Sequence, residues 1–399
     1  MLKTFVLLLL ALVLLGGPGV PPSSSPAFTR DTYMTKQAKQ DVNLVRAKTL
    51  YQTILTHFYV ADFNLFREHN QVLPGDNAFS FLWPYSGMIS ATKALAAAPG
   101  GDKYQVDLVR VLDGLEQYWD GGANPPGYDS YVREYGGGQK YYDDNEWLGL
   151  DFVDAYRMLG DPAYLNKAKA TFAFAISGWS MDLGGGIFWR ENDTTTKNTC
   201  SNGPAAVLAL KLYQETGDEE YLDWVIRILD WLTLLEAPSG VYWDSISDQG
   251  AIDLRTYTYN TGTVLHANAL LYTITGEQKF LDKARALAEA SVVHFMREDP
   301  QTAQLFYPDT PWFNAVLLRG YVALYHADPQ RDPRFIETMR ANLDYAWTHA
   351  RGENGFINPD WSGDASVRRG SDGKEGVYCL LDQAALVEMY ATLAQLVLA

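Results

Sequence analysis

Hydrophobic residues recur at intervals of three and four along most of the chain, which is the spacing of amphipathic helices. Three related segments punctuate this pattern, and each combines a glycine, an acidic residue, two variable residues, an aromatic residue and a leucine. A glycine followed by an acid fits the end of one helix and the start of the next. Each segment therefore predicts the corner of a helical hairpin. The segments are "LGDPAYLNKAKA" (159–170), "TGDEEYLDWVIR" (216–227) and "TGEQKFLDKARA" (275–286).

The same periodicity extends beyond the three corners and predicts about twelve helices in six alternating pairs. Strand signal is weak, and short hairpins are expected only at 184–191 and 240–245. The helices that precede the corners are richer in apolar and small residues, as an inner ring of helices requires. We therefore predict an all-α fold, an (α/α)6 toroid of six helical hairpins, with an irregular all-α domain as the alternative. The further expected helices are 38–60 with 80–97, 103–119 with the helix after 141, 312–326 with 333–350, and 378–398.

The N-terminus has a different pattern. Lys3 precedes an almost wholly apolar run from Thr4 to Leu15, and "GGPGVPPSSSP" follows it. This order is typical of a secretory signal peptide, and the run is short for a membrane span. We expect a signal peptide and linker at 1–25 and a single (α/α)6 domain at 35–399. The protein is then secreted, with retention at the cell surface or an uncleaved anchor as alternatives.

Composition narrows the classes of partner. The net charge is −16 and the pI is near 4.8, which argues against binding to nucleic acid or to an anionic membrane. It argues more weakly against an acidic polysaccharide. The chain holds 11 Trp, 25 Tyr and 17 Phe, which can stack on sugar rings or simply fill the core. No HExxH, CxxC or glycine-rich phosphate loop occurs, so we expect no metal and no cofactor, and we expect a monomer.

Polar and aromatic residues gather just before each predicted inner helix. In an alternating toroid these helix starts all lie at one end of the ring, so their side chains are expected to share one mouth. Convergent polar groups in an aromatic concavity are typical of a ligand site, although each residue could equally be a cap or a core hydrogen-bonder. The residues expected there are Asp143, Asp144, Asn198, Asn202, Tyr259, Asn260, Trp312 and Asp382.

The stretch "YYDDNEW" (141–147) places two aspartates at one of these helix starts. They could serve only as an N-cap and a first-turn acid, both of which favour a helix. They could also be a catalytic pair. Retaining glycosidases hold two carboxyl groups roughly 5–5.5 Å apart, closer than inverting enzymes do, and adjacent residues suit the closer class. The like charge of one aspartate would raise the pKa of the other, as a general acid requires.

Six segments together resemble glycoside hydrolase family 76, the α-1,6-mannanases, over nearly the whole chain after the N-terminal segment. The resemblance implies an (α/α)6 toroid and a retaining, endo-acting enzyme. It also implies that Asp143 is the nucleophile and that Asp144 is the general acid/base. The segments are "YYDDNEWLGL" (141–150), "GGIFWRE" (185–191), "KNTCSNGPAAVLALKLY" (197–213), "GVYWDSI" (240–246), "TYNTGT" (258–263) and "LLDQAA" (380–385).

The resemblance implies that Asp244, Tyr259 and Asn260 lie at the sugar site. Trp147 and Trp189 match recurrent aromatic positions of the family, where a ring can either wall the cleft or simply pack in the core. Three departures from the usual family pattern leave substrate detail open, namely Leu148 after Trp147, Thr261 before Gly262, and Asn314 where lysine is common. The expected substrate-binding residues are Asp244, Tyr259, Asn260, Asn202, Trp147, Trp189 and Trp312.

The function predicted from the sequence is a secreted retaining endo-α-1,6-mannanase that acts on mannan. The alternatives are another toroid glycosidase, a transglycosylase on cell-wall glycans, and a non-catalytic glycan-binding toroid.

Overall fold

The computed structural model describes residues 36–300, 302–362, 375–396 and 398, so the predicted signal peptide at 1–25 lies outside the described residues. Within these ranges twelve α-helices alternate between an inner and an outer layer, with short strands between them. The inner helices are α2 (Leu82–Ala97), α4 (Tyr142–Leu159), α6 (Thr199–Thr216), α8 (Thr258–Thr275), α10 (Pro311–Ala327) and α12 (Leu380–Gln395). The outer helices are α1 (Lys36–His57), α3 (Tyr104–Leu115), α5 (Pro162–Ser177), α7 (Glu219–Leu232), α9 (Gln278–Phe295) and α11 (Arg334–Tyr345).

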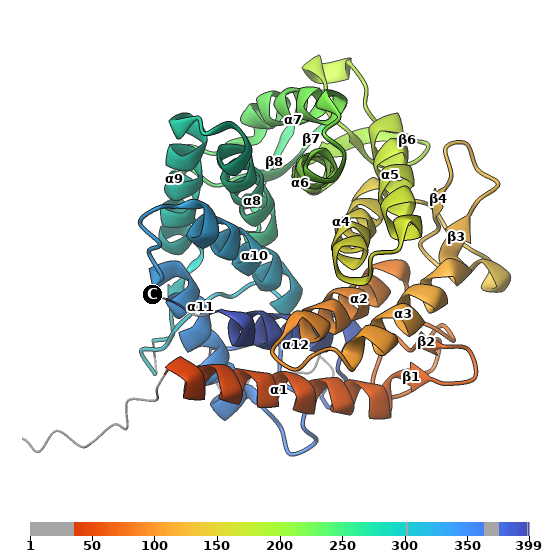
Figure 1. Cartoon of the computed structure of the whole chain (residues 1–399), viewed down its shortest axis with the longest axis vertical. Coiled ribbons are helices and arrows are strands. Elements are labelled where there is room, and N and C mark those ends of the chain that lie inside the picture. The colour runs from red at the N-terminus through yellow and green to blue at the C-terminus, as the bar shows by residue number, and fades with distance from the viewer. Residues whose placement is uncertain (1–35, 301, 363–374, 397, 399) are drawn as a thin grey trace, which may run out of the picture. The chain divides into compact units, whose positions relative to one another are not determined.

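The inner helices close into a ring. Each packs on the next in the order α2, α4, α6, α8, α10 and α12, and α12 returns to α2 (Figure 1). The outer helices cover this ring, and one continuous cluster of buried apolar residues runs from Ala47 in α1 to the C-terminal Leu398. The predicted all-α toroid of helical hairpins is confirmed.

The repeated corners form as their sequences require. Gly160, Gly217 and Gly276 end α4, α6 and α8 with φ of 74°, 69° and 70°, a left-handed conformation that glycine adopts without steric cost. At the first two corners the side chain of the following acid, Asp161 or Asp218, caps the next helix, whereas Glu277 takes the N-cap position without a side-chain cap bond. The Asp161 carboxylate accepts the backbone N–H of Ala163 at 2.9 Å and starts α5.

Small residues allow the inner helices to approach one another closely. A Cβ atom on Gly262 of α8 would lie 2.7 Å from the Cα atom of Leu317 in α10. One on Gly320 of α10 would lie 2.6 Å from the Gly262 carbonyl oxygen. Larger residues at these points would force α8 and α10 apart, which explains why the inner helices combine apolar with small side chains.

A buried network of ion pairs links the inner helices near their C-terminal ends. Lys93 of α2 bonds Asp154 of α4 at 2.8 Å, and Lys211 of α6 bonds the same carboxylate at 2.6 Å. Arg319 of α10 forms a bidentate pair with Glu388 of α12, with the shorter bond at 2.6 Å. Charges buried in the middle of the ring are therefore paired, as burial requires.

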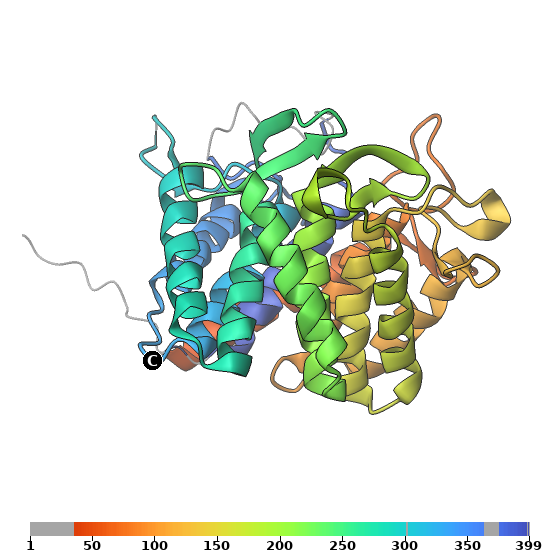
Figure 2. The ribbon, with the colours of Figure 1, turned by 90° about the horizontal axis from the view of Figure 1, so that it is seen from above.

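A four-stranded antiparallel sheet lies over one end of the helices (Figure 2). It joins β5 (Phe188–Arg190), β6 (Asp193–Asn198), β7 (Trp243–Ser247) and β8 (Ile252–Thr256) in chain order. The two hairpins expected at 184–191 and 240–245 overlap β5 and β7, but β6 and β8 were not predicted. Their sequences, "DTTTKN" and "IDLRT", are too polar to give a clear apolar alternation. Two-stranded ribbons pair β1 (Tyr59–Val60) with β2 (Leu65–Phe66), β3 (Trp119–Asp120) with β4 (Gly127–Tyr128), and β9 (Arg297–Glu298) with β10 (Leu305–Phe306).

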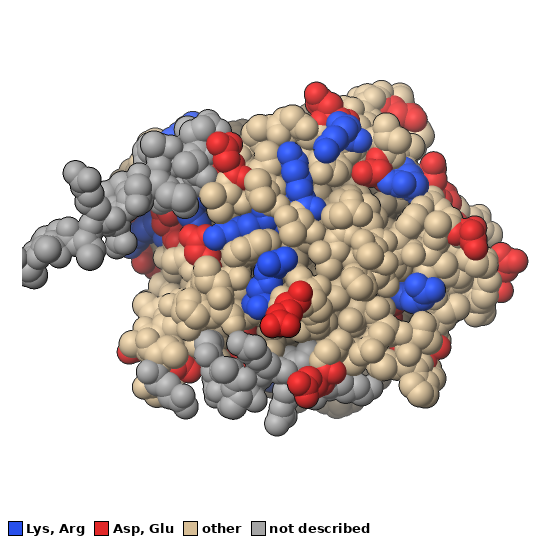
Figure 3. Space-filling view, turned by 90° about the horizontal axis from the view of Figure 1, so that it is seen from below, with Lys and Arg blue, Asp and Glu red and all other residues tan. Residues whose placement is uncertain are grey.

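On the side shown in Figure 3, acidic and basic side chains are interspersed over a largely uncharged area. Among the described residues, the structure has no helix that combines the length and apolar character needed to cross a membrane.

Candidate active site

A pocket of about 670 Å³ opens where the inner helices begin, beneath the four-stranded sheet. It receives side chains from the starts of α2, α4, α6, α8 and α10, so the predicted common mouth of the ring exists. Of the predicted residues, Asn202, Asn260 and Asp382 do not line it. Those that do are Asp143, Asp144, Trp147, Trp189, Asn198, Asp244, Tyr259 and Trp312.

Asp143 and Asp144 occupy the first turn of α4, directly after Tyr141 in extended conformation. Both are half-buried in the pocket wall, and the Asp143 carboxylate accepts the backbone N–H of Asp144 at 3.1 Å. Burial raises the pKa of Asp143 to about 6, although hydrogen bonds to its carboxylate partly offset this rise. Burial, and then the charge of Asp143, raise the pKa of Asp144 well above the usual range. Asp143 is therefore the one that ionises first, while Asp144 retains its proton.

A chain of hydrogen bonds supports the ionised form of Asp143. The Cys200 thiol at the start of α6 and the Trp189 indole N–H of β5 lie close enough to its carboxylate to lower its pKa as donors. The Tyr259 hydroxyl of α8 donates in turn to the Cys200 sulfur. Burial raises the pKa of the Cys200 thiol well above its usual range, so it remains a protonated donor. Nothing in the sequence distinguished Cys200 as a site residue, because a lone cysteine carries no motif.

The side chain of one asparagine fixes the start of α4 through three hydrogen bonds to the backbone. Asn145, the fourth residue of α4, accepts the Tyr128 backbone N–H at 2.7 Å and donates to the carbonyls of Tyr128 and Tyr141 at 3.1 and 2.9 Å. Asn202, the fourth residue of α6, repeats this arrangement: it accepts the Ile187 N–H at 2.9 Å and donates to the carbonyls of Ile187 and Asn198. Asn202 therefore lies behind the pocket and positions its wall, whereas the sequence had suggested a substrate contact.

Asp244 lies across the pocket, on β7. Its carboxylate accepts from the Asn260 amide at 3.3 Å and faces the Arg255 guanidinium at 3.6 Å. Burial raises the pKa of Asp244, while Asn260 and Arg255 oppose the rise. Asn260 is fully buried and acts on the site through Asp244. Arg255 belongs to β8, and its role in the pocket was missed together with that strand.

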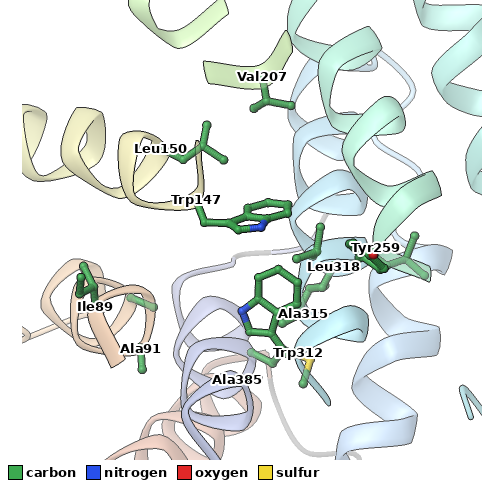
Figure 4. Packing of buried hydrophobic residues seen from close by; sticks show 14 of the residues in the cluster. Ile89, Ala91, Trp147, Leu150, Val207, Tyr259, Trp312, Ala315, Leu318 and Ala385 are labelled. Carbon is green, nitrogen blue, oxygen red and sulfur yellow. The ribbon is translucent and has the colours of Figure 1, made fainter. Parts of the chain in front are cut away.

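Aromatic rings form the floor of the pocket. Trp312 contacts Trp147 edge-to-face at 4.9 Å and Trp83 at 5.3 Å, measured between ring centroids. Trp147 and Trp312 lie between the inner helices (Figure 4) and are 4% and 2% exposed, so most of each ring packs in the core. Trp189 differs, since it is 38% exposed and packs beside Tyr141 at the rim. Of the three tryptophans predicted to bind substrate, Trp189 is therefore the one whose ring is open to the pocket.

Two further lining residues carry polar atoms without a partner. The Asn198 Oδ1 atom and the Trp83 Nε1 atom are buried and unbonded, although both residues line the pocket. One is an acceptor and the other a donor, so together they suit a ligand rich in hydroxyl groups. Over the described residues, no cluster of three or more His, Cys, Asp or Glu side chains is arranged to hold a metal ion.

Comparison with known proteins points to one family. The family model described as glycosyl hydrolase family 76 matches residues 44–397. A mannan endo-1,6-alpha-mannosidase of Saccharomyces cerevisiae is 31% identical over 147 residues, which cover 34% of this chain and 33% of that protein. The matched region therefore spans about a third of such curated relatives.

Solved structures match over greater lengths. A family 76 glycoside hydrolase (mannosidase) of Bacteroides thetaiotaomicron has a TM-score of 0.79 and 29% identity, and the match covers 88% of this chain and 98% of that one. An α-1,6-mannanase of a Salegentibacter species, in an inactive variant with two consecutive aspartates changed to asparagine, is in complex with α-1,6-mannotriose. It has a TM-score of 0.73 and 26% identity, with 88% of this chain and 99% of that chain covered.

Proposed function

Since the chain belongs to glycosyl hydrolase family 76, we propose that it is a secreted retaining endo-α-1,6-mannanase, with residues 35–399 as its single catalytic domain. This proposal depends above all on one observation: within the Asp143–Asp144 pair, Asp143 loses its proton more readily and Asp144 keeps its proton. Two adjacent carboxyl groups share one pocket, and the pKa of Asp144 is raised further than that of Asp143 because it also feels the charge of its neighbour. One group is therefore a nucleophile and the other an acid.

In the first step, an Asp143 carboxylate oxygen attacks the anomeric carbon of a mannose unit. Asp144 gives its proton to the glycosidic oxygen, the bond between that oxygen and the anomeric carbon breaks, and a covalent mannosyl–Asp143 ester remains. In the second step, Asp144, now a carboxylate, takes a proton from water while the water oxygen attacks the same carbon. The ester bond between that carbon and Asp143 breaks, which releases Asp143 as a carboxylate. Two inversions return the α configuration and restore both aspartates.

The surrounding residues suit a neutral polyol. Acceptors and donors are offered by Asp244, Asn198 and Trp83, and Trp189 presents a ring at the rim. The pocket is lined by five acids and one arginine, namely Glu68, Asp143, Asp144, Asp244, Asp253 and Arg255. A negatively charged sugar polymer would be repelled, which favours mannan over a uronic-acid polymer.

Relatives support the same assignment. The Saccharomyces cerevisiae relative is a mannan endo-1,6-alpha-mannosidase, and the Salegentibacter enzyme is an α-1,6-mannanase. The inactive variant of the latter lacks two consecutive aspartates and forms a complex with α-1,6-mannotriose. We assign the equivalent pair to Asp143 and Asp144.

The test is incubation of the purified protein with linear α-1,6-mannan, followed by sizing of the products. A ladder of short oligomers is expected, and Asp143→Asn and Asp144→Asn should each abolish it while retaining affinity for mannotriose. Asp248→Asn, an exposed change at the tip of the sheet, is the matched control and should leave turnover unchanged. Wild-type protein that leaves mannan intact would refute the proposal, and full turnover in either doublet variant would refute the assigned roles.

A further inference from the structure

Glu146 is an anomaly beside the active site. It is 0% exposed, and neither of its carboxyl oxygens has a hydrogen-bond partner of ordinary geometry. It follows Asp143 by three positions on α4, so both side chains face the same side of that helix. Buried polar groups without partners are rare, and this one lies one helical turn from the proposed nucleophile.

The helix next to α4 in the ring is α6 (Figure 1), and the two pack together along their length. The backbone N–H of Ala205 is near enough to lower the pKa of Glu146, and Asp143 meets the Cys200 thiol of the same helix start. Two side chains of α4 therefore contact the segment 200–205 of α6, one at each end.

That segment of α6 is short of a hydrogen-bond donor. Pro204 lies inside the helix and has no N–H, so the Cys200 carbonyl lacks its usual donor four residues on. The Ser201 hydroxyl is also buried without a partner. A protonated carboxylic acid offers what is missing, because its carbonyl oxygen can accept an N–H while its hydroxyl donates.

The surroundings of Glu146 favour that protonated form. Burial, and then the charge of Asp143, raise its pKa well above the usual range. The first turn of α6, "TCSNGPA" (199–205), has no charged side chain, and Cys200 there remains a thiol. On α2 the charged residue is Lys93, which is paired with Asp151 and Asp154.

The strands β4 and β5 also contact α4: β4 has no charged side chain, and Arg190 of β5 is paired with Asp193. The remaining neighbour of α4 is α5, which likewise offers Glu146 no counter-ion. Its lysines are Lys167, paired with Glu116, and Lys169, which is exposed. With no cation against it, an ionised carboxylate at position 146 would be very costly.

We propose that Glu146 is a positioning residue for the glycosidase reaction: a neutral carboxylic acid that ties the first turn of α4 to the proline-interrupted start of α6 and thereby holds the Cys200 thiol on Asp143. This inference rests on the proposed function only in so far as Asp143 is the nucleophile. It assigns Glu146 no contact with substrate.

Two variants separate this role from mere packing. Glu146→Gln preserves the shape and one donor, so turnover and pH profile should stay within a few-fold of wild type. Glu146→Leu fills the same space without polar atoms and removes the cost of burying a carboxyl group, so the protein should remain folded by circular dichroism. Its kcat/KM should nevertheless fall about threefold at pH 6 and little at pH 8, because loss of the thiol hydrogen bond raises the pKa of Asp143 and moves the acidic limb of the pH profile to higher pH.

A measurement without substrate completes the test. The infrared S–H band of Cys200 reports the strength of its hydrogen bond, and the chain has two cysteines, so Cys200→Ser and Cys379→Ser assign the bands. Glu146→Leu should move the Cys200 band to higher frequency, while Glu146→Gln should leave it in place. Val153→Ala creates a cavity further along α4 and serves as a control. It should lower the free energy of unfolding without changing the Cys200 S–H band or the pH profile of activity.

A Glu146→Leu protein with the wild-type S–H band and acidic limb would overturn the inference, as would a Glu146→Gln protein that behaves like Glu146→Leu. Failure of the wild-type protein to cleave mannan would instead refute the proposed function, since the band shift is measured without any substrate.

Discussion

The hydrogen bond from Cys200 to Asp143 gives a prediction with a calculable size. Cys200→Ala removes a donor that lowers the pKa of the Asp143 carboxyl, so that pKa must rise. A hydrogen bond of this kind contributes about 1 kcal/mol net, and 1.36 kcal/mol corresponds to about one pH unit. The pKa of Asp143 should therefore rise by about 0.7, from about 6 to nearly 7.

The assay is the pH dependence of kcat/KM on α-1,6-mannan, whose acidic limb reports ionisation of the nucleophile in the free enzyme. At pH 6 the ionised fraction of Asp143 would fall from about one half to about one sixth, so kcat/KM should fall about threefold there and stay nearly unchanged at pH 8.

Two matched variants control for packing. Cys200→Ser retains a hydroxyl donor and should keep the acidic limb near its wild-type position. Cys379→Ala changes the other cysteine, at the start of α12, and should not move it. An acidic limb that stays in place in Cys200→Ala, or that moves to lower pH, would refute the reasoning.

Three further predictions concern the scaffold. Lys197→Met removes an ammonium that donates to the carbonyls of Ser180, Asp182 and Gly185 at 2.6–2.8 Å, so unfolding in urea should show a loss of a few kcal/mol, whereas Lys169→Met on the exposed face of α5 should show none. Gly217→Ala places a Cβ at φ 69° and should cost about 1 kcal/mol by the same measurement; an unchanged midpoint would contradict the corner geometry. Trp312→Ala should cost about 3–5 kcal/mol of stability, while Trp189→Ala should leave the melting temperature in place and raise KM for mannan; the reverse pattern would contradict the division between floor and rim.

The toroid could be predicted from the sequence because its determinants are local and repeated. A glycine followed by an acid specifies each corner, and helices of contrasting apolar content alternate on either side, so the layer of each helix follows from its composition. Because the inner helices of an alternating toroid all point the same way, their polar N-terminal residues must lie together at one end of the ring. Strands β6 and β8 escaped prediction because their sequences are polar and lack a clear apolar alternation. The pairing of β6 with β7 also joins residues about 50 positions apart, such as Thr196 and Ser247, which a local pattern does not reveal.

The site was predictable only in part. The doublet and the aromatic residues were visible as motifs, whereas the contributions of Cys200, Arg255 and Glu146 depend on which helices and strands become neighbours. Asn202 shows the opposite difficulty. Its position in a polar cluster suggested a ligand contact, but its amide is fully used on the backbone of Ile187 and Asn198, an arrangement that only a three-dimensional structure reveals.

The stereochemistry of the first product is the most direct test of a double displacement by Asp143 and Asp144. Proton NMR of α-1,6-mannan during the first minutes of hydrolysis should show the α anomer of the new reducing end, with the β anomer growing in later by mutarotation. Initial release of the β anomer would show a single displacement and would contradict the assignment of Asp143 as nucleophile.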